Sequence, residues 1–218
     1  DVLAIAGGAG IVGVGAAVAV TDITNNVDAN LASGANAGSG TVTVTAEDRM
    51  EIDADAKGAA VGAAAAGVVV SHAGKNSTIN ASAGGEITAA NATISATDQG
   101  QVKALGQAAA GGLLGAGSGA FVTASDESKV NALAAERTIF KLGSGTLKLE
   151  ATGTPQTEAE ADGVAVSGGL SIGASIAEAR SKTTIVAKLG TGADVTSGQL
   201  DVLAMRNVVG TKPSALAK

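Results

Sequence analysis

The sequence predicts an all-β fold, a parallel β-solenoid in which strand–turn–strand units stack along one axis. Alanine recurs at one position of a repeated unit, and inside each unit apolar and polar residues alternate with a period of two. The 218 residues include 45% hydrophobic residues and 32 Gly, but only two Phe and no Tyr or Trp. A core built from these residues lacks the large aromatic side chains of ordinary globular cores. It has to be thin, because only small side chains are available to fill it. We expect one repetitive domain over residues 1–218, a segment of a longer chain.

The repeat is anchored on a small residue that is followed eight positions later by alanine. The seven anchors are Thr21, Ala46, Ala73, Ala96, Ala124, Ala151 and Ala179, and the alanines are Ala29, Ala54, Ala81, Ala104, Ala132, Ala159 and Ala187. An eighth, degenerate anchor at Ala204 is broken by Gly210 and Lys212, which predicts a distorted last unit. The anchors follow one another at a nearly even spacing along the chain. This spacing predicts about eight coils of roughly 26 residues, and a rod of about 40 Å at the usual strand separation.

Strict alternation around the anchors indicates strands with one buried face. Val42, Val44 and Ala46 alternate with threonines, for example. Polar runs after the anchors predict turns, at residues 47–49, 97–100, 125–128 and 152–155. An antiparallel sandwich is the alternative, but short hairpin signals are nearly missing apart from Asp162-Gly163.

Two kinds of unit alternate along the chain. Three residues before an anchor, the outward position is polar in one kind, at Thr43, Thr93, Lys148 and Asp201. In the other kind it is apolar, at Val18, Val70, Phe121 and Ile176. The true repeat is therefore a double unit of roughly 52 residues. The four apolar residues form a candidate interface.

The segments that lead to the apolar positions are apolar on both faces, over residues 59–70, 111–122 and 164–176. Strands of this kind are normally covered on both sides. Either a wide, flattened coil folds these segments inside, or they form an interaction surface for a partner.

The residues offer little for catalysis or for nucleic-acid binding. The net charge is −6, the 14 basic residues are scattered, and stacking aromatics are almost missing. His72 is the only histidine, so neither a triad nor a histidine metal site is indicated. Asp53 and Asp55 could touch a calcium ion, but a solvated face is the simpler interpretation. We expect no enzyme, no cofactor and no metal, and the apolar stretch 61–70 is too short to span a bilayer.

The repeat resembles the repeat region of giant bacterial surface proteins, the leukotoxin-like and filamentous-haemagglutinin-like adhesins. The resemblance recurs along nearly the whole chain, and it is carried by residues 13–20, Asn25-Asn26, Ala29 and residues 40–46. It implies a right-handed β-helix, secretion across the Gram-negative envelope to the cell surface, and adhesion or self-association. The amino-terminal secretion domain of that family is not seen in this sequence, and no binding residue of the family carries over.

The expected function is a structural or adhesive shaft of a secreted surface fibre. Its expected partners are other copies of the same coil, by end-to-end stacking or lateral contact, and a receptor on a host or neighbouring cell. No capping element is visible, and residues 1–4 recur as residues 201–204. One alternative is a flat binding face for a surface, a glycan or ice, starting from Thr41, Thr43, Thr45 and Thr93. A polysaccharide-cleaving β-helix enzyme is the weakest alternative, because aromatic sugar platforms are missing.

Overall fold

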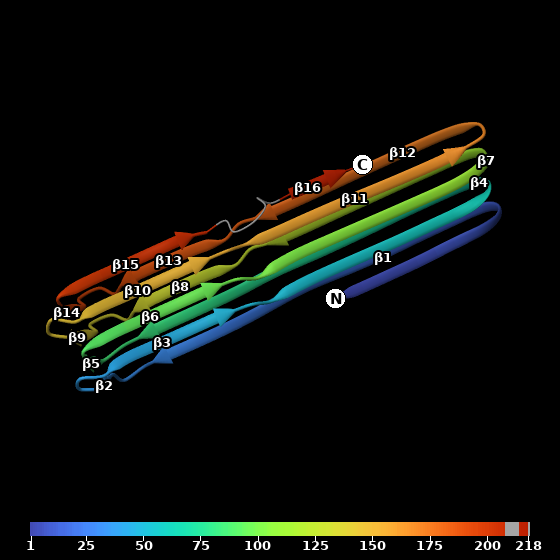
Figure 1. Ribbon diagram of the computed structural model, residues 1–218. Helices are drawn as coiled ribbons and strands as arrows, with labels where there is room; N and C mark the ends of the chain where they lie inside the picture. Colours follow the sequence, from blue (N-terminus) through green and yellow to red (C-terminus); the bar gives the residue numbers. More distant parts are fainter. Residues whose placement is uncertain (208–213, 218) are drawn as a thin grey trace.

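The computed structural model describes residues 1–207 and 214–217, and it is all-β within that part of the chain (Figure 1). Every strand pair is parallel. The strands are β1 (Val2–Leu31), β2 (Ala35–Asn36), β3 (Thr41–Asp48), β4 (Glu51–Ala83), β5 (Glu86–Thr88), β6 (Asn91–Asp98), β7 (Gln101–Asp126), β8 (Lys129–Ala134), β9 (Ile139–Lys141), β10 (Thr146–Gly153), β11 (Gln156–Ser167), β12 (Leu170–Ser181), β13 (Thr184–Leu189), β14 (Asp194–Thr196), β15 (Gln199–Arg206) and β16 (Ser214–Ala217). Long parallel strands in stacked, curled sheets are compatible with the predicted β-solenoid.

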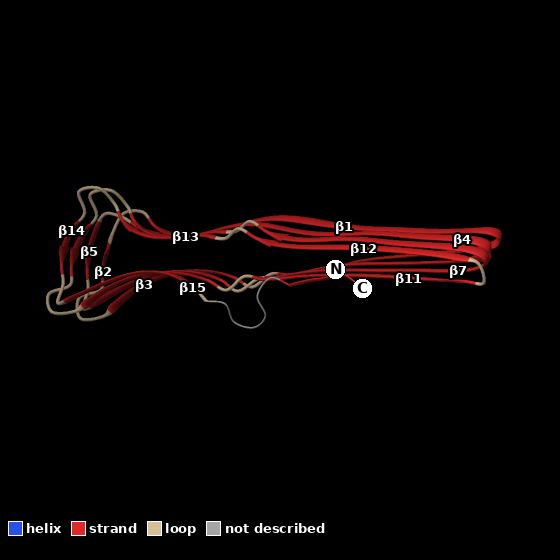
Figure 2. Cartoon of the chain, turned by 90° about the horizontal axis from the view of Figure 1, so that it is seen from above, coloured by secondary structure: helices blue, strands red, loops and turns tan. Residues whose placement is uncertain are grey.

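The chain winds between two facing walls, which Figure 2 shows from above. Wall A holds the parts of β1, β4 and β7 that follow their reversal at the thin end, together with β8, β12 and β13. Wall B holds β3, β6, β10, β11, β15 and β16, together with the parts of β1, β4 and β7 that precede the reversal. The short strands β2, β5, β9 and β14 close the wide end, whereas at the thin end the chain reverses directly from wall B to wall A.

Strand register corrects the predicted size of the coil. Val2 lies beside Ala54, Glu51 beside Gln101, and Gln101 beside Gln156, so the neighbour in the stack comes two anchors further along the chain. The prediction of about eight short coils, one for each anchor, is therefore wrong. Each single unit passes along one wall only, and the sheets that contain β3 and β2 are four strands deep. The double unit is the interval that repeats in space, because successive anchors lie on opposite walls.

The alanine columns are buried, as predicted. Ala54, Ala104 and Ala159 stack in wall B, and Ala81 stacks on Ala132 in wall A. These five are at most 3% exposed. Ala187 is only partly buried, because its strand, β13, lies at the edge of the stack.

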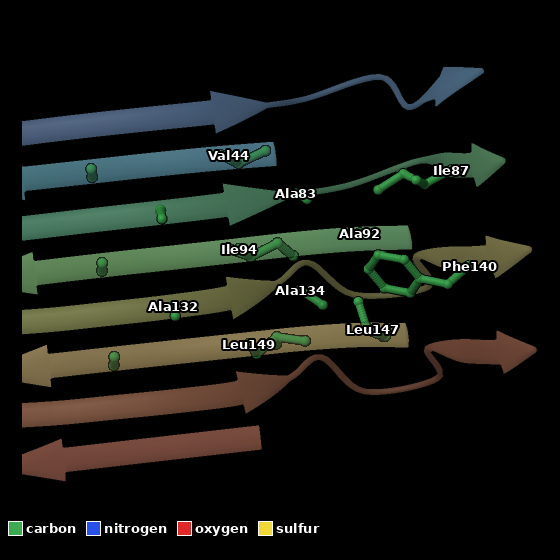
Figure 3. Packing of buried hydrophobic residues seen from close by; sticks show 14 of the residues in the cluster. Val44, Ala83, Ile87, Ala92, Ile94, Ala132, Ala134, Phe140, Leu147 and Leu149 are labelled. Carbon is green, nitrogen blue, oxygen red and sulfur yellow. The ribbon is translucent and has the colours of Figure 1, made fainter. Parts of the chain in front are cut away.

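The core tapers from the wide end to the thin end. Beside the cross-strands it holds large side chains such as Ile87, Phe140 and Leu149 (Figure 3). Near the thin end the buried cluster consists of alanines only, namely Ala60, Ala65, Ala110 and Ala116. A Cβ on Gly15 would lie 2.2 Å from the carbonyl oxygen of Ala59 on the opposite wall. The walls approach so closely here that only Gly and Ala fit between them.

The polar runs predicted as turns are short breaks inside a wall. β3 and β4 continue one another along wall B, and across this break the ladder between coils persists, with Gln99 N–H donating to the Asp48 carbonyl at 2.8 Å. The true reversals lie in the wide-end loops and at the thin end, where Gly8 and Val14 of β1 come to lie against each other. The turn prediction fails because alternation continues through the polar runs and places an aspartate on the inner face. The distortion predicted at Gly210 and Lys212 lies outside the described residues.

Candidate interaction surface and a buried charge cluster

The thin end is an apolar wedge that contains no charged side chain. Residues 58–71, 108–122 and 163–177 fold back on themselves there, and none of them is Asp, Glu, Lys or Arg. Their inward positions carry mostly Ala and Gly, and their outward positions carry Val, Ile, Leu and Phe interspersed with further Ala and Gly. The most exposed large side chains of this end sit at the reversals, including Ile11, Leu113 and Leu114, which are 74% to 85% exposed. The two-sided apolar segments are thus core on one face and open surface on the other.

The four residues of the candidate interface form one column on the outer face of wall A. Val18 pairs with Val70, Val70 with Phe121, and Phe121 with Ile176. Their exposed fractions are 61%, 37%, 43% and 57% in that order. The column is therefore on the surface, and substitutions there do not enlarge a core residue.

A shallow apolar groove lies beside this column, nearer the reversals. Its floor contains Gly115 and Gly117 of β7, and its rims carry Val14 of β1 and Ile172 of β12. The groove exists because the two middle strands carry small residues, such as Ala66 and Gly117, between Val14 and Ile172. Such an extended apolar surface is unusual for a free protein.

The other sequence candidates lie apart on the outer surface. His72 Nε2 is 3.0 Å from Asp22 Oδ1 on the neighbouring strand. On wall B, Thr43 lies beside Thr93, but the next strand carries Lys148 at this position. The row of threonines therefore ends there. Asp53 lies beside Lys103 of the next strand, and the Lys103 ammonium lies 4.0 Å from Glu158. Among the described residues, no three His, Cys, Asp or Glu side chains gather as a metal site would need.

Sequence inspection missed a cluster of charged residues inside the molecule. Lys75 of wall A is fully buried, and its Nζ lies 2.5 Å from Asp98 Oδ1 and 3.2 Å from Asp48 Oδ2 on wall B. Asp126 lies beside Lys75 on the neighbouring strand of wall A and is also fully buried. The signal was in the alternation: Asp48, Lys75, Asp98 and Asp126 each stand two positions after a buried alanine anchor. They therefore point inward as the anchors do.

Burial and charge shift the ionisation of this cluster in defined directions. Burial alone would lower the pKa of Lys75, but the Asp98, Asp126 and Asp48 charges and the Asp98 hydrogen bond together raise it. Burial raises the pKa of the Asp126 carboxyl, opposed by hydrogen bonds from Ser128 and by the Lys75 charge. Three carboxyl groups surround one ammonium, so the neutral form of one acid is favoured in this dry environment.

Comparisons with protein-family models, with curated proteins and with solved structures give no match for this chain. Within residues 1–207 and 214–217, no helix has the length and apolar character needed to cross a membrane.

Proposed function

We propose that this chain is a shaft segment of a secreted bacterial surface fibre, a right-handed β-solenoid whose coils associate edge to edge. The observation that carries this proposal is the pair of open sheet edges. Within the described residues, β1, β2 and β3 have a partner strand on one side only, and so do β12 to β15 at the opposite edge. Unpaired parallel edges accept further strands of the same kind. The repeat and its resemblance to surface adhesins support the extracellular location and the adhesive role.

The columns that cross the stack specify which side chains a further coil would meet. In the column of Val14, Ala66 and Gly117, the outermost residue at the far edge is Ile172. The Val18 column ends in the same way on Ile176. When the β12 edge of one copy meets the β1 edge of the next in this register, apolar residues meet apolar residues.

One column also carries opposite charges at its two ends. Asp22 stands at the β1 edge, followed by Gly74 and Ser125, and Arg180 stands at the β12 edge. Edge-to-edge stacking in register places the Arg180 guanidinium of one copy beside the Asp22 carboxylate of the next. This complementarity favours head-to-tail stacking over head-to-head stacking.

A charge exchange tests this register. We expect the wild-type chain to form concentration-dependent assemblies, measured by sedimentation velocity and imaged as filaments by electron microscopy. Asp22→Arg and Arg180→Asp should each weaken assembly, by about threefold to tenfold per contact, because like charges then meet across the joint. The double variant should recover the wild-type assembly, since the pair is restored with exchanged partners.

Asp28→Arg is the matched control, because Asp28 lies on the same face of β1 and its column ends on the uncharged Val186. It should assemble like the wild type. The stacking proposal is wrong if the wild-type chain stays a monodisperse monomer at high concentration. Single variants that assemble as the wild type does would overturn the register.

A further inference from the structure

Lys75 and Asp98 meet in a site that is closed to water and held by backbone groups. Both side chains are fully buried, and Asp48 beside them is 5% exposed. Asp98 Oδ1 accepts hydrogen bonds from Lys75 Nζ and, at 3.0 Å, from Gly100 N–H. Asp98 Oδ2 has no hydrogen-bond partner. The two oxygens of this carboxyl group are therefore in different environments, one oriented by donors and one free.

Gly100 makes the close contact between the two walls possible. A Cβ at this position would lie 2.0 Å from Lys75 Nζ. Any other residue would push the Lys75 side chain away from the carboxyl group. The backbone thus leaves room for the nitrogen directly beside the Asp98 carboxyl group, with Nζ 2.5 Å from Oδ1, and holds the two groups in the proximity that a reaction between them needs.

Asp48 supplies the third group that an acyl transfer needs. Its Oδ2 lies 3.2 Å from Lys75 Nζ, an ionic contact that is not aligned as a hydrogen bond. A carboxylate at this distance can take a proton from the ammonium and release the amine as a nucleophile. Asp126 lies beside Lys75 on the next strand, and burial favours the neutral form of its carboxyl group.

We propose that Lys75 and Asp98 form an intramolecular amide bond that covalently joins wall A to wall B. The Lys75 ammonium gives one proton to Asp48, and the free amine attacks Cγ of Asp98. Gly100 N–H holds the charge that develops on Oδ1. The Nζ–Cγ bond forms and the Cγ–Oδ2 bond breaks. Oδ2 leaves as water, with one proton returned by Asp48 and one from Nζ.

The step balances without any further reactant. An ammonium, a carboxylate and the Asp48 carboxylate become an amide, one water and the same Asp48 carboxylate, so three protons and one net negative charge are conserved. Nothing is oxidised or reduced. The dry site favours the product, because two buried ions are replaced by a neutral amide. The raised pKa of Lys75 makes the free amine scarce, so the reaction is a slow, single maturation event.

The intact mass of the purified full chain, measured under denaturing conditions, tests the bond. We expect the mass to be lower than the sequence mass by one water. Proteolysis should give a branched peptide that joins the segments around residues 75 and 98, and trypsin should fail to cut after Lys75. Lys75→Met and Asp98→Ala should restore the full linear mass, and Asp48→Asn should slow the loss of water.

The control for the chemistry is Asp53→Asn, an outer-face aspartate whose variant should lose water as the wild type does. Loss of water at Asp162-Gly163 by cyclisation gives the same mass change, and the branched peptide distinguishes the two events. A full linear mass for the wild-type chain, or a branch that ends on Asp48 or Asp126 in place of Asp98, would overturn the assignment. The wild-type mass and branched peptide are independent of fibre assembly, and this part of the test requires no variant to fold.

Discussion

At the scale of single residues, side-chain size and charge decide what fits between the two walls. The inner positions hold small or purely apolar side chains, such as Ala54, Ala81 and Ile52. Lys75 and Asp98 are exceptions. Their burial is tolerated because the ammonium and the carboxylate form an ion pair. Asp126 has no such dedicated cation, and its Oδ2 is without a hydrogen-bond partner.

The ionisation of Asp126 should make stability depend on pH. Its pKa is raised in the fold, so the folded state binds this proton more tightly than the unfolded state does. The resulting stabilisation is complete below the unfolded pKa, about 4, and it is lost as the pH rises through the raised folded pKa. Asp126→Asn keeps an oxygen that can accept from Ser128 and removes the charge. Its free energy of unfolding at pH 7 should exceed the wild-type value by roughly 1 kcal/mol.

Chemical denaturation of both proteins between pH 3 and pH 8 measures this difference. The advantage of the variant should vanish at the acidic end, where Asp126 is protonated in both states. Asp162→Asn, at a surface position, is the control and should follow the wild-type curve. An Asp126→Asn protein that is less stable than the wild type at pH 7 would show that the ionised carboxylate is favourable.

At the scale of strands, successive residues point alternately to the core and to the outer surface. In 64–70 of β4, odd-numbered residues such as Val69 face the narrow core, and even-numbered residues such as Val70 face outward. Both sets are apolar, so the sequence of this segment alone does not reveal which face is buried. The opposite wall settles it, because Val69 packs against that wall and is fully buried, whereas Val70 is 37% exposed.

Lysine substitutions separate the outer face from the core. Val70→Lys with Phe121→Lys places two charges on the exposed column, and we expect a folded protein with an unchanged circular dichroism spectrum. Lateral contacts that use this column should be lost, as measured by light scattering. Val69→Lys with Val122→Lys is the matched inner pair, and it should unfold the chain, because both residues are at most 2% exposed. Unfolding of the outer pair would mean that the column is core.

At the scale of the whole molecule, the stack has an interior and two margins. β4 and β7 have partner strands on both sides, whereas β1 has a partner on one side only. Backbone amides in the middle of the stack therefore open only when neighbouring coils separate. This follows from a repeat architecture in which each coil is stabilised by its neighbours.

Hydrogen exchange should report this gradient. Amides of β4 and β7 should exchange at least about tenfold more slowly than those of β1 and β12, as measured by mass spectrometry of peptides. Raising the protein concentration should slow exchange in β1 and β12 selectively if the edges pair with other copies. Uniform protection across all strands at low concentration would contradict nearest-neighbour stabilisation.

The sequence by itself determined the strands, the buried alanines and the double repeat, because each depends on a local period of two or on recurrence along the chain. It placed Val18, Val70, Phe121 and Ile176 in one column, which the register confirms. It could not give the size of the coil, because the anchors of wall A and wall B look alike in sequence and differ only in which wall they join. It also treated the residues around Asp48 and Asp98 as turns.

Only the tertiary structure decided where the chain reverses and which charges meet. Lys75 and Asp98 are separated by 23 positions and lie on opposite walls, so no local pattern links them. Their encounter depends on the distance between the walls, and that distance is set by the small residues packed along the core. In the same way, the wedge is exposed because the walls close on Gly and Ala there and leave no room inside for the larger apolar side chains.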